Sequence, residues 1–395
     1  MQTEFVVKKD YDIVVVGGGI AGVAASVAAA RKGASVLLLE KSVNLGGLAT
    51  IGLISWYEPL CDGEGNQMIA SIGEELIKLT AKYGFDTIPE HWGGDGMLKQ
   101  KPDRPRYTSR FSPTIFMLAL DRYMEENGVE VLFDALATYP QMEGGHCNGI
   151  IVETVGGTEF YGAKYVIDAT GTAVVMKRAG VPTVDGLNYL SYVAHGFTYE
   201  SAKKFAETKD IKAFRRWISS GSDLTGKGHP EGMGMVKGTT SADVTWFIKE
   251  GKRRMLDKLE NDDRFSRDLM DLPTMPQYRK ICRIEGDYVF MGTELDVKFD
   301  DAIGSCGDFR KAGKRFQIPY RCLYNSRFDN LLAAGRIISA EDEGWEITRV
   351  IPVAAMTGEA AGVAAALCVK NGCAVNALDI QTLQDTLKSN GVIFR

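Results

Sequence analysis

A run of glycines at residues 17–22 constrains the fold of this chain more than any other feature of its sequence. The six residues read GGGIAG and contain the pattern GxGxxG. An apolar run at 12–16 predicts a buried strand before the glycines, an alanine-rich stretch at 22–32 predicts a helix after them, and a second apolar run at 35–40 predicts another strand. This order predicts a βαβ unit at the start of a parallel sheet.

The spacing of these glycines is typical of a turn that binds a dinucleotide. Gly17 would make the tight turn, Gly19 would let the backbone approach a pyrophosphate, and Gly22 would let helix and strand pack closely. The phosphate charge would lie at the amino end of the helix, where unpaired N–H groups favour an anion. Glu40 ends the next strand and can accept hydrogen bonds from ribose hydroxyls, whereas its charge disfavours NADP. The motif alone does not separate NAD from FAD.

Three further segments bear on that choice. LGGLAT at 45–50 has a glycine pair that would let the backbone lie against the ribityl and flavin part of an extended cofactor. IDATG at 167–171 places small residues at the carboxyl end of a strand, where α/β sheets bind ligands. NLLAAGR at 330–336 is followed by RVIP at 349–352, where a helix amino end could face the flavin N1/C2 carbonyl edge. Each segment alone could be an ordinary loop or core element, but their order favours FAD.

In this order the motifs resemble the large FAD-dependent oxidoreductase family, in the branch related to fumarate reductase and the glutathione-reductase-type flavoproteins. The resemblance extends to residues 272–279, to RIEGDY at 283–288 and to IPYR at 318–321, which are similar to substrate-domain segments of that family. It implies the α/β class, with a GR-type Rossmann-like FAD-binding domain and an inserted α+β substrate domain. It also implies non-covalent FAD, because no histidine lies between 41 and 60, where some relatives attach the flavin.

The resemblance, together with the motifs, assigns candidate FAD contacts residue by residue. These candidates are Gly17, Gly19, Ile20, Ala21, Gly22, Glu40, Lys41, Gly46, Gly47, Thr50, Ala137, Ala169, Thr170, Gly171, Gly335, Arg336 and Pro352. The sequence departs from the family at Thr172, where members commonly have Asp, and at 341–342, where Glu-Asp replaces a frequent Thr-His pair. The usual acid/base assignment therefore cannot be transferred.

At 395 residues the chain is long enough for two domains. The expected FAD-binding domain comprises 1–58, 105–175 and 322–375, the expected substrate or cap domain comprises 59–104 and 176–321, and the expected C-terminal helix comprises 376–395. The central part is assigned to the cap because it is more charged and shows no parallel-sheet pattern. We also expect helices over 67–83 and 112–127, a loop over 89–106, a strand over 129–137 and a hairpin turn at 156–157.

A flavin dehydrogenase needs a substrate C–H placed over flavin N5, a base for the departing proton and charges that orient the substrate. Arg283, Arg321 and Arg349 could bind a carboxylate or polarise a carbonyl, or could be salt-bridged packing residues. His195 is the best placed of four histidines, although a structural role is an alternative. The remaining acid/base candidates are Tyr320, Asp342, Glu343 and Glu346, with solvated carboxylates as the alternative for the acids.

The predicted function is hydride transfer, in either direction, between a small polar organic substrate and FAD. Oxidation of a C–O or C–N bond and reduction of a C=C bond are both open. One alternative is a flavin monooxygenase or halogenase, since 344–345 and 351–352 are similar to parts of a halogenase motif whose second Trp is absent. The others are a non-catalytic FAD-binding subunit of a larger assembly and an NAD-only dehydrogenase.

Composition narrows the remaining classes. The net charge of −5 argues against nucleic acid as a main partner. Seven cysteines without a CxxC pair disfavour a disulfide framework and a structural zinc site, and no metal site is visible. The apolar run at 350–369 is interrupted by polar residues and glycines, so we expect a buried helix and no membrane span. With no signal peptide recognised, we expect a cytoplasmic enzyme with an unidentified electron acceptor, and a homo-oligomer is open.

Overall fold

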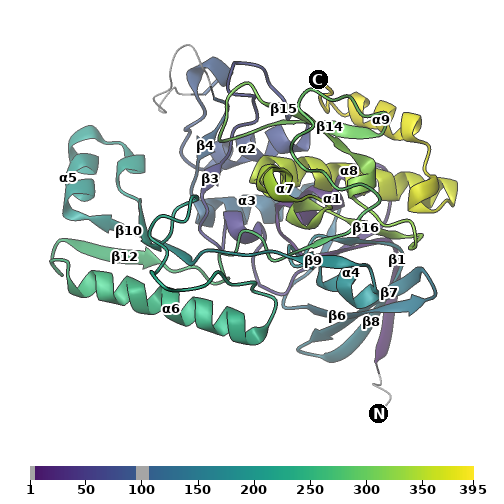
Figure 1. Ribbon diagram of the computed structural model, residues 1–395, viewed down its shortest axis with the longest axis horizontal. Helices are drawn as coiled ribbons and strands as arrows, with labels where there is room; N and C mark the ends of the chain where they lie inside the picture. The colour runs from purple at the N-terminus through teal and green to yellow at the C-terminus, as the bar shows by residue number, and fades with distance from the viewer. Residues whose placement is uncertain (1–4, 95–105) are drawn as a thin grey trace. The chain divides into compact units, whose positions relative to one another are not determined.

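A computed structural model describes residues 5–94 and 106–395 (Figure 1). The chain divides into two compact units. Unit 1 comprises Met1–Gly46, Trp56–Val184 and Cys282–Arg395, and unit 2 comprises Gly47–Ser55 and Asp185–Ile281. The fold is α/β with a Rossmann-like core of parallel strands, as the sequence predicts.

Unit 1 is built on a seven-stranded sheet in the order β5-β2-β1-β8-β7-β6, with β16 paired to β8. Its strands are β1 (Val6–Val16), β2 (Val36–Leu39), β5 (Glu130–Leu132), β6 (Leu136–Glu143), β7 (His146–Thr154), β8 (Gly157–Asp168) and β16 (Leu331–Ala333). The pairs β1–β2, β1–β8, β2–β5 and β8–β16 are parallel, and β6–β7–β8 is an antiparallel meander. Val16 is in register with Leu39 and Asp168, and Ala333 with Asp168, so these carboxyl ends lie along one edge.

The expected single strand over 129–137 is wrong. The chain makes two strands there, because Asp134 adopts the left-handed conformation (φ 51°) between them. The first, β5, pairs with β2, and the second, β6, pairs with β7. The predicted hairpin turn is confirmed, since Thr154 of β7 pairs with Gly157 of β8.

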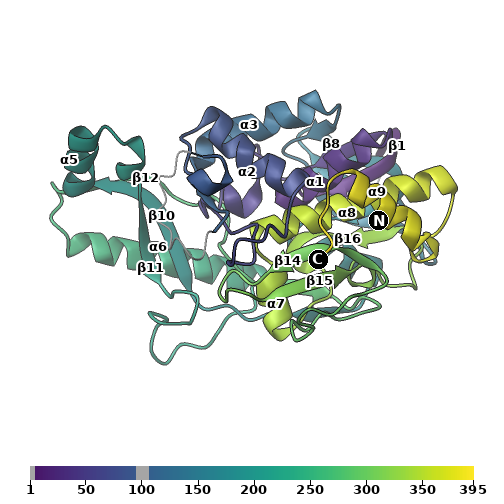
Figure 2. The same ribbon diagram turned by 90° about the horizontal axis from the view of Figure 1, so that it is seen from above.

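Helices α1 (Ile20–Arg31) and α8 (Ile351–Asn371) pack on one another, and Figure 2 shows them side by side. Small residues make this contact possible: a Cβ atom built on Gly358 would lie 2.2 Å from the Ala21 carbonyl oxygen, and one on Gly362 would lie 2.1 Å from that of Ala25. Of the described helices, α8 alone is long and apolar enough to cross a membrane, but 83% of its most apolar window is buried inside the structure. It is a core helix of unit 1.

Helices α2 (Ile72–Tyr83) and α3 (Pro113–Glu126) also belong to unit 1. Helix α3 begins as predicted, with Pro113 in its first turn and the Ser112 hydroxyl accepting from the Ile115 amide. Helix α2 begins five residues later than the expected 67, after Ser71, whose hydroxyl donates to Glu359 of α8 at 2.6 Å. Helix α2 packs on α3 and α8, which is why residues 59–94 lie in unit 1 and not in a separate cap.

The rest of unit 1 consists of short elements. They are β3 (Trp56–Tyr57), β4 (Ser109–Arg110), α4 (Val174–Ala179), β13 (Cys282–Ile284), β14 (Ala302–Gly307), β15 (Arg315–Pro319), α7 (Asp342–Thr348) and α9 (Ile380–Ser389), while β9 (Thr183–Asp185) runs across the boundary between the units. The β14–β15 pair packs against α8 and α9 through β14. Consequently 282–321, expected in the cap, lies in unit 1, whereas 47–55, expected in the FAD-binding domain, lies in unit 2.

Unit 2 contains a three-stranded antiparallel sheet in the order β11-β10-β12. Its elements are β10 (Ser191–Thr198), α5 (Tyr199–Thr208), β11 (Arg216–Gly221), α6 (Ser241–Glu260) and β12 (Arg267–Asp271). Tyr192 and Ala194 of β10 pack with Met255 of α6 in its core. The charged run on α6 is an exposed face with ion pairs such as Arg253–Glu250. Short 3-10 helices lie at Gly47–Ala49, Glu90–Trp92, Ile211–Ala213, Tyr320–Cys322, Gly335–Ile337 and Val375–Ala377.

Candidate functional site

The turn between β1 and α1 has the geometry that its glycines predict. Gly17 adopts φ +101° and donates its N–H to the Leu39 carbonyl at 2.8 Å. A Cβ atom on Gly22 would lie 1.8 Å from the Gly17 oxygen, so only glycine lets the helix start so close to the strand. At Gly19, the N-cap of α1, no described atom lies within 4 Å of a built Cβ. The amino end of α1, with Ile20 and Ala21 in its first turn, therefore borders open space that suits an anion.

Glu40 follows β2 directly and is 7% exposed. Its Oε2 accepts from the Gly18 amide at 2.6 Å and its Oε1 from the Ser42 amide at 2.8 Å. Two backbone donors hold the carboxylate beside the glycine turn, and its remaining lone pairs can accept from hydroxyl groups. The neighbouring Lys41 is exposed.

The segment that carries LGGLAT begins on the same turn. Gly46 donates its N–H to the Gly18 carbonyl at 2.8 Å and pairs with Gly19 in a parallel bridge. Gly47 and Thr50 belong to unit 2, where the Thr50 amide donates to the Gly47 carbonyl at 3.1 Å. The structure thus divides this predicted motif between the two units.

The carboxyl edge of the sheet carries the next group of candidates. Asp168 is fully buried and accepts from the amides of Thr170, Val175 and Met176, so it shapes the turn and the start of α4. The Ala169 amide donates to the Val16 carbonyl at 2.8 Å.

The turn after β16 and the start of α8 meet this edge. Gly335 adopts φ +77° and donates its amide to the Thr357 hydroxyl at 3.0 Å. A Cβ atom on Gly335 would lie 2.8 Å from that of Ala21. Pro352 lies in the first turn of α8, as predicted, whereas Ala137 lies in β6 of the antiparallel meander.

Three of the predicted catalytic residues are engaged in structural contacts. Tyr320 is 1% exposed, its hydroxyl donates to the Val375 carbonyl at 3.0 Å, and burial raises its pKa well above the usual value. Arg321 is 45% exposed and forms an ion pair with Asp301 at 2.9 Å. The Arg283 side chain is 2% exposed and pairs with Glu341 at 2.6 Å. These contacts correspond to the packing alternative for the two arginines.

His195 lies in unit 2 and is fully buried. Arg215 can only donate, so the hydrogen bond from its Nη1 to His195 Nδ1 at 3.0 Å makes Nδ1 an acceptor. The proton is then on Nε2, which faces the Leu53 carbonyl at 3.1 Å and the Ser55 hydroxyl at 3.3 Å. Burial, together with the charge of Arg215, lowers the pKa of His195 to about 4. The imidazole is therefore neutral and holds the 47–55 segment on β10.

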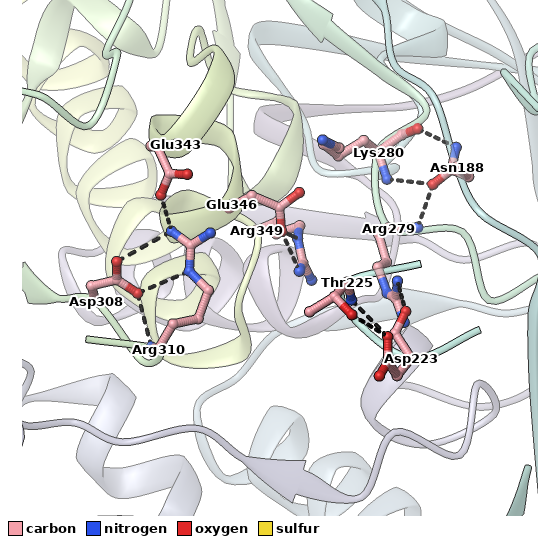
Figure 3. A network of polar contacts seen from close by, with 10 residues as sticks. All are labelled: Asn188, Asp223, Thr225, Arg279, Lys280, Asp308, Arg310, Glu343, Glu346 and Arg349. Atoms are coloured by element: carbon pink, nitrogen blue, oxygen red, sulfur yellow. Dashed lines mark hydrogen bonds and ion pairs between the residues drawn. The ribbon is translucent and has the colours of Figure 1, made fainter. Parts of the chain in front are cut away.

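Arg349 has a different setting in unit 1. It caps the carboxyl end of α7 and precedes Val350, the N-cap of α8. Both Nε and Nη2 donate to one oxygen of Glu346 (Figure 3). The guanidinium lies 5.9 Å from the centre of the Phe309 ring. Only 11% of the Arg349 side chain is exposed. The group is fixed in orientation at the amino end of the core helix.

The segment 308–310, between β14 and β15, contacts several charged side chains, Arg349 among them. Arg106 donates from Nη1 to the Phe309 carbonyl at 2.7 Å, so Arg106 and Arg349 contact the same residue. Arg310 lies between Asp308 and Glu343 and pairs with both (Figure 3). The positive charge of Arg310 is thus balanced by the carboxylates of Asp308 and Glu343.

Two more residues complete this group. Arg336 donates from Nε to the Gly171 carbonyl at 2.7 Å, and burial, together with the charge of Arg349, lowers its pKa to about 10. Glu58, partly buried just after β3, has its pKa raised to about 7 by burial, against the opposing effects of Arg349 and Arg106. We refer to the side chains of Arg106, Arg336 and Arg349 as the guanidinium cluster.

Sequence reasoning missed Glu58 and Arg106. The signal for Glu58 was weak: a single acid between the aromatic pair at 56–57 and Pro59. Arg106 lies at the end of the segment expected to be a loop, most of which (95–105) is outside the described residues. Neither residue belongs to a sequence motif. Arg106, for example, contacts Phe309, about 200 positions further along the chain, and such a contact leaves no local pattern.

Unit 2 has a cavity of its own, of about 250 Å³, whose lining includes Tyr192, Phe247, Lys252 and Pro276. In the same unit, the side-chain oxygen of Asn188 accepts hydrogen bonds from the backbone amides of Arg279 and Lys280, as Figure 3 shows. Among residues 5–94 and 106–395 no group of three or more His, Cys, Asp or Glu side chains could hold a metal ion.

Comparison with known proteins agrees with a dinucleotide site at the glycine turn between β1 and α1. The family model described as FAD dependent oxidoreductase matches residues 12–191 and 230–387. Digeranylgeranylglycerophospholipid reductase of Methanoculleus marisnigri is 32% identical over 187 residues, which cover 45% of this chain and 43% of the relative. Glutathione reductase of Yarrowia lipolytica is 29% identical over 181 residues, which cover 45% of this chain and 34% of the relative. The matches thus span less than half of either relative.

Among solved structures, a geranylgeranyl bacteriochlorophyll reductase-like protein from Thermoplasma acidophilum is 14% identical, with a TM-score of 0.45 over 97% of this chain and 82% of that one. The residues of unit 1 fit a bound dinucleotide: open space at the amino end of α1, a fixed carboxylate after β2 and the amino end of α8 beside the same turn. With the family match over most of its length, the chain belongs to the FAD-dependent oxidoreductase family and uses FAD as its cofactor.

Proposed function

We propose that this oxidoreductase transfers a hydride between FAD and a small polar organic substrate that carries a carboxylate or a similar anionic group. The observation that carries the proposal is the guanidinium cluster, in which Arg106, Arg336 and Arg349 gather next to the amino end of α8. Guanidinium groups are well suited to planar oxygen pairs, and a partly buried cluster of them favours an anionic ligand.

The arginines of the cluster are each held in place by a different contact. Arg349 donates to Glu346 through Nε and Nη2, and these two contacts do not use its Nη1. Arg106 is anchored through one nitrogen to the Phe309 carbonyl, while the Phe309 ring offers an apolar surface beside Arg349. These contacts preorganise the charges, so an anion is oriented without reordering long side chains. FAD, when bound, supplies the hydride chemistry.

The test is to add small carboxylic, hydroxy and amino acids to the yellow holoprotein and to follow the flavin spectrum, first in air and then anaerobically. We expect a bound anion to perturb the spectrum and a true substrate to bleach it. Arg349→Met should weaken anion binding by about 10- to 100-fold, since a hydrogen bond to a charged group contributes about 1.5–3 kcal/mol. Arg321→Met, which removes an exposed ion pair outside the cluster, is the matched control. Equal binding by both variants would contradict the proposal.

Three finer points belong to the same proposal. The flavin is held without a covalent bond, so acid precipitation should leave all of it in the supernatant. Unit 2 serves as the substrate domain of a cytoplasmic enzyme, and an acceptor or donor outside this chain completes turnover. The monooxygenase and halogenase alternative predicts that oxygen is consumed in proportion to product. The setting of Trp345 disfavours a role like that of the halogenase motif, because its side chain is 5% exposed and its Nε1 donates to the Arg336 carbonyl.

A further inference from the structure

We infer that the cavity of unit 2 is a second ligand site, and that it binds a small carboxylic acid with an apolar body, such as an arylacetate. Every residue that lines the cavity lies within 185–281 and therefore belongs to unit 2. The site shares no residue with the guanidinium cluster, whose arginines all belong to unit 1. The inference therefore goes beyond the proposed function and does not depend on it.

The lining comes from a helix, a strand and a connecting segment of unit 2. Helix α6 contributes Phe247, Ile248 and Lys252, β10 contributes Tyr192, and the segment 272–277 after β12 contributes the rest. Ile248 and Lys252 are one helical turn apart, so their side chains lie on the same face of α6. Phe247 and Tyr192 are buried, whereas Lys252 is exposed. The cavity thus extends from the core of unit 2 to its surface.

The segment 272–277 is held in place by hydrogen bonds. The Thr274 amide donates to the Ile51 carbonyl at 3.0 Å. The Gln277 side chain accepts from the Val193 amide at 2.7 Å and donates to the Val193 carbonyl at 2.9 Å. The two prolines of the segment have fixed φ angles, which restricts its backbone further. The space is therefore present before a ligand arrives, and binding need not order this wall.

Apolar groups make up most of the lining. They are the side chains of Phe247, Ile248, Leu272, Pro273, Met275 and Pro276. Such walls bind the apolar part of a ligand, because its transfer out of water is favourable. The cavity has a volume of about 250 Å³. Since a water molecule takes about 30 Å³ in the liquid, this space suits a single ring with a short side chain.

Lys252 is the one charged side chain among the lining residues. Within residues 5–94 and 106–395, its ammonium group makes no hydrogen bond or ion pair. By contrast, the next two cations of α6, Arg253 and Arg254, are both bound to Glu250. An ammonium group without a protein partner at the open end of an apolar cavity favours a ligand that ends in a carboxylate.

Tyr192 adds a polar group on the core side of the lining. Its ring lies against α6 because residue 251 is glycine: a Cβ atom built on Gly251 would lie 2.5 Å from a carbon of the Tyr192 ring. The Tyr192 hydroxyl is buried and has no hydrogen-bond partner among the described residues. Buried hydroxyls are normally paired with protein, water or ligand. This one therefore indicates that a bound molecule or water completes the hydrogen bonding on this side.

The expected ligand differs in chemistry from the small polar anion proposed for the guanidinium cluster. A single exposed ammonium group contributes little to affinity by itself. Most of the affinity at this cavity must therefore come from burial of the apolar body of the ligand. Phenylacetate should bind to unit 2, whereas acetate, which carries the same charge without the ring, should show no measurable binding there.

The experiment is calorimetric titration of the FAD-loaded protein with phenylacetate. We expect Lys252→Met to bind it about two- to fivefold more weakly than the wild type, since methionine keeps an apolar stem but removes the charge. Lys249→Met is the matched control, because Lys249 is an exposed lysine of the same helix that does not line the cavity. This variant, like Arg349→Met in the guanidinium cluster, should bind phenylacetate as tightly as the wild type.

Phenylacetamide separates the charge of the ligand from its shape. The wild type should bind this neutral analogue about two- to fivefold more weakly than phenylacetate, whereas Lys252→Met should bind the two equally. A preference for phenylacetate that persists in Lys252→Met but disappears in Arg349→Met would place the acid on the guanidinium cluster and overturn the inference.

The methyl group of Met275 reports where the ring is bound. In protein labelled at its methionine methyl groups, phenylacetate should shift the NMR signal of Met275 through the ring current and leave that of Met356, on α8 of unit 1, unchanged. Met275→Leu identifies the signal. A ligand that shifts Met356 and not Met275, or no binding of phenylacetate to the wild type, would refute the inference. Neither result bears on the proposed function, which is tested with small polar acids and Arg349→Met.

Discussion

The Nε of Arg336 donates to the carbonyl oxygen of Gly171 over 2.7 Å, which ties the turn after β16 to the turn after β8. Gly171 adopts φ +70°, and a Cβ atom built on it would lie 2.8 Å from that same nitrogen. The bond therefore depends on glycine for both the backbone conformation and the space. It also connects the carboxyl edge of the sheet, where FAD contacts are predicted, to the guanidinium cluster.

Replacement of Gly171 by alanine should disturb this connection. Gly128 is a matched control, because its φ of +69° is nearly the same and no described atom lies within 4 Å of its built Cβ. The left-handed conformation should cost each alanine variant about 1–2 kcal/mol of unfolding free energy. Only Gly171→Ala should also lose affinity for FAD. Chemical denaturation and fluorescence titration with FAD measure the two effects, and equal FAD affinity in both variants would contradict this prediction.

Two glycines of the first turn should respond differently to the same change. Gly19→Ala should leave the stability of the FAD-free protein nearly unchanged, since its Cβ would enter open space, but should weaken FAD binding at least tenfold by filling the approach of the pyrophosphate. Gly22→Ala should destabilise the fold itself, because its Cβ would lie 1.8 Å from the Gly17 oxygen. Thermal denaturation with and without FAD separates the two. A stable Gly22→Ala protein would show that α1 can move away from β1.

Glu359 should make the protein less stable as the pH rises. Its pKa is raised to about 7, mainly by burial, from the ordinary value of 4.5. Ionisation is thus disfavoured in the folded state, and the unfolding free energy should fall between about pH 4.5 and pH 7, by up to about 3 kcal/mol. Glu359→Gln should reduce the difference in stability between pH 5 and pH 8, measured by urea denaturation at a fixed FAD concentration. An unaltered difference would mean that Glu359 is ionised at little cost in the folded protein.

His195 should behave as a neutral structural residue. Its pKa is lowered to about 4, so its contribution to stability is present above the usual pKa of 6.5 and is lost as the pH falls from there towards 4. Its imidazole N–H should remain visible by NMR, in a single tautomer, at pH 5.5. His195→Phe should destabilise unit 2 by roughly 2–4 kcal/mol, because Arg215 and the Leu53 carbonyl lose their partner. A pH–rate profile whose limb near 6.5 vanishes in His195→Gln would point to catalysis instead.

The glycine turn after β1 and the position of the acid after β2 were predictable because their signals are local. Gly17, Gly22 and Glu40 lie within one βαβ unit, so the positions of the glycines and the acid follow from strand, turn and helix geometry alone. Pro352 at the start of α8 and Ser112 at the start of α3 were likewise readable, since each acts within one turn of helix. The boundaries of the two units were less predictable, because α2 belongs to unit 1 through its contacts with α1, α3 and α8, which are distant in sequence.

The sequence by itself determined the βαβ unit, its glycine turn and the acid after β2, because each depends on residues a few positions apart. The cofactor class followed from the order of four separated motifs. Only the tertiary structure decided which polar side chains stand together. Arg321 and Arg349 looked alike in sequence, yet Arg321 pairs with Asp301 near the surface, whereas Arg349 lies over the Phe309 ring. Arg106 and Arg349 come from distant parts of the chain and are both placed against Phe309, between β14 and β15. Such long-range contacts, and the burial that sets proton affinities, have no local signature.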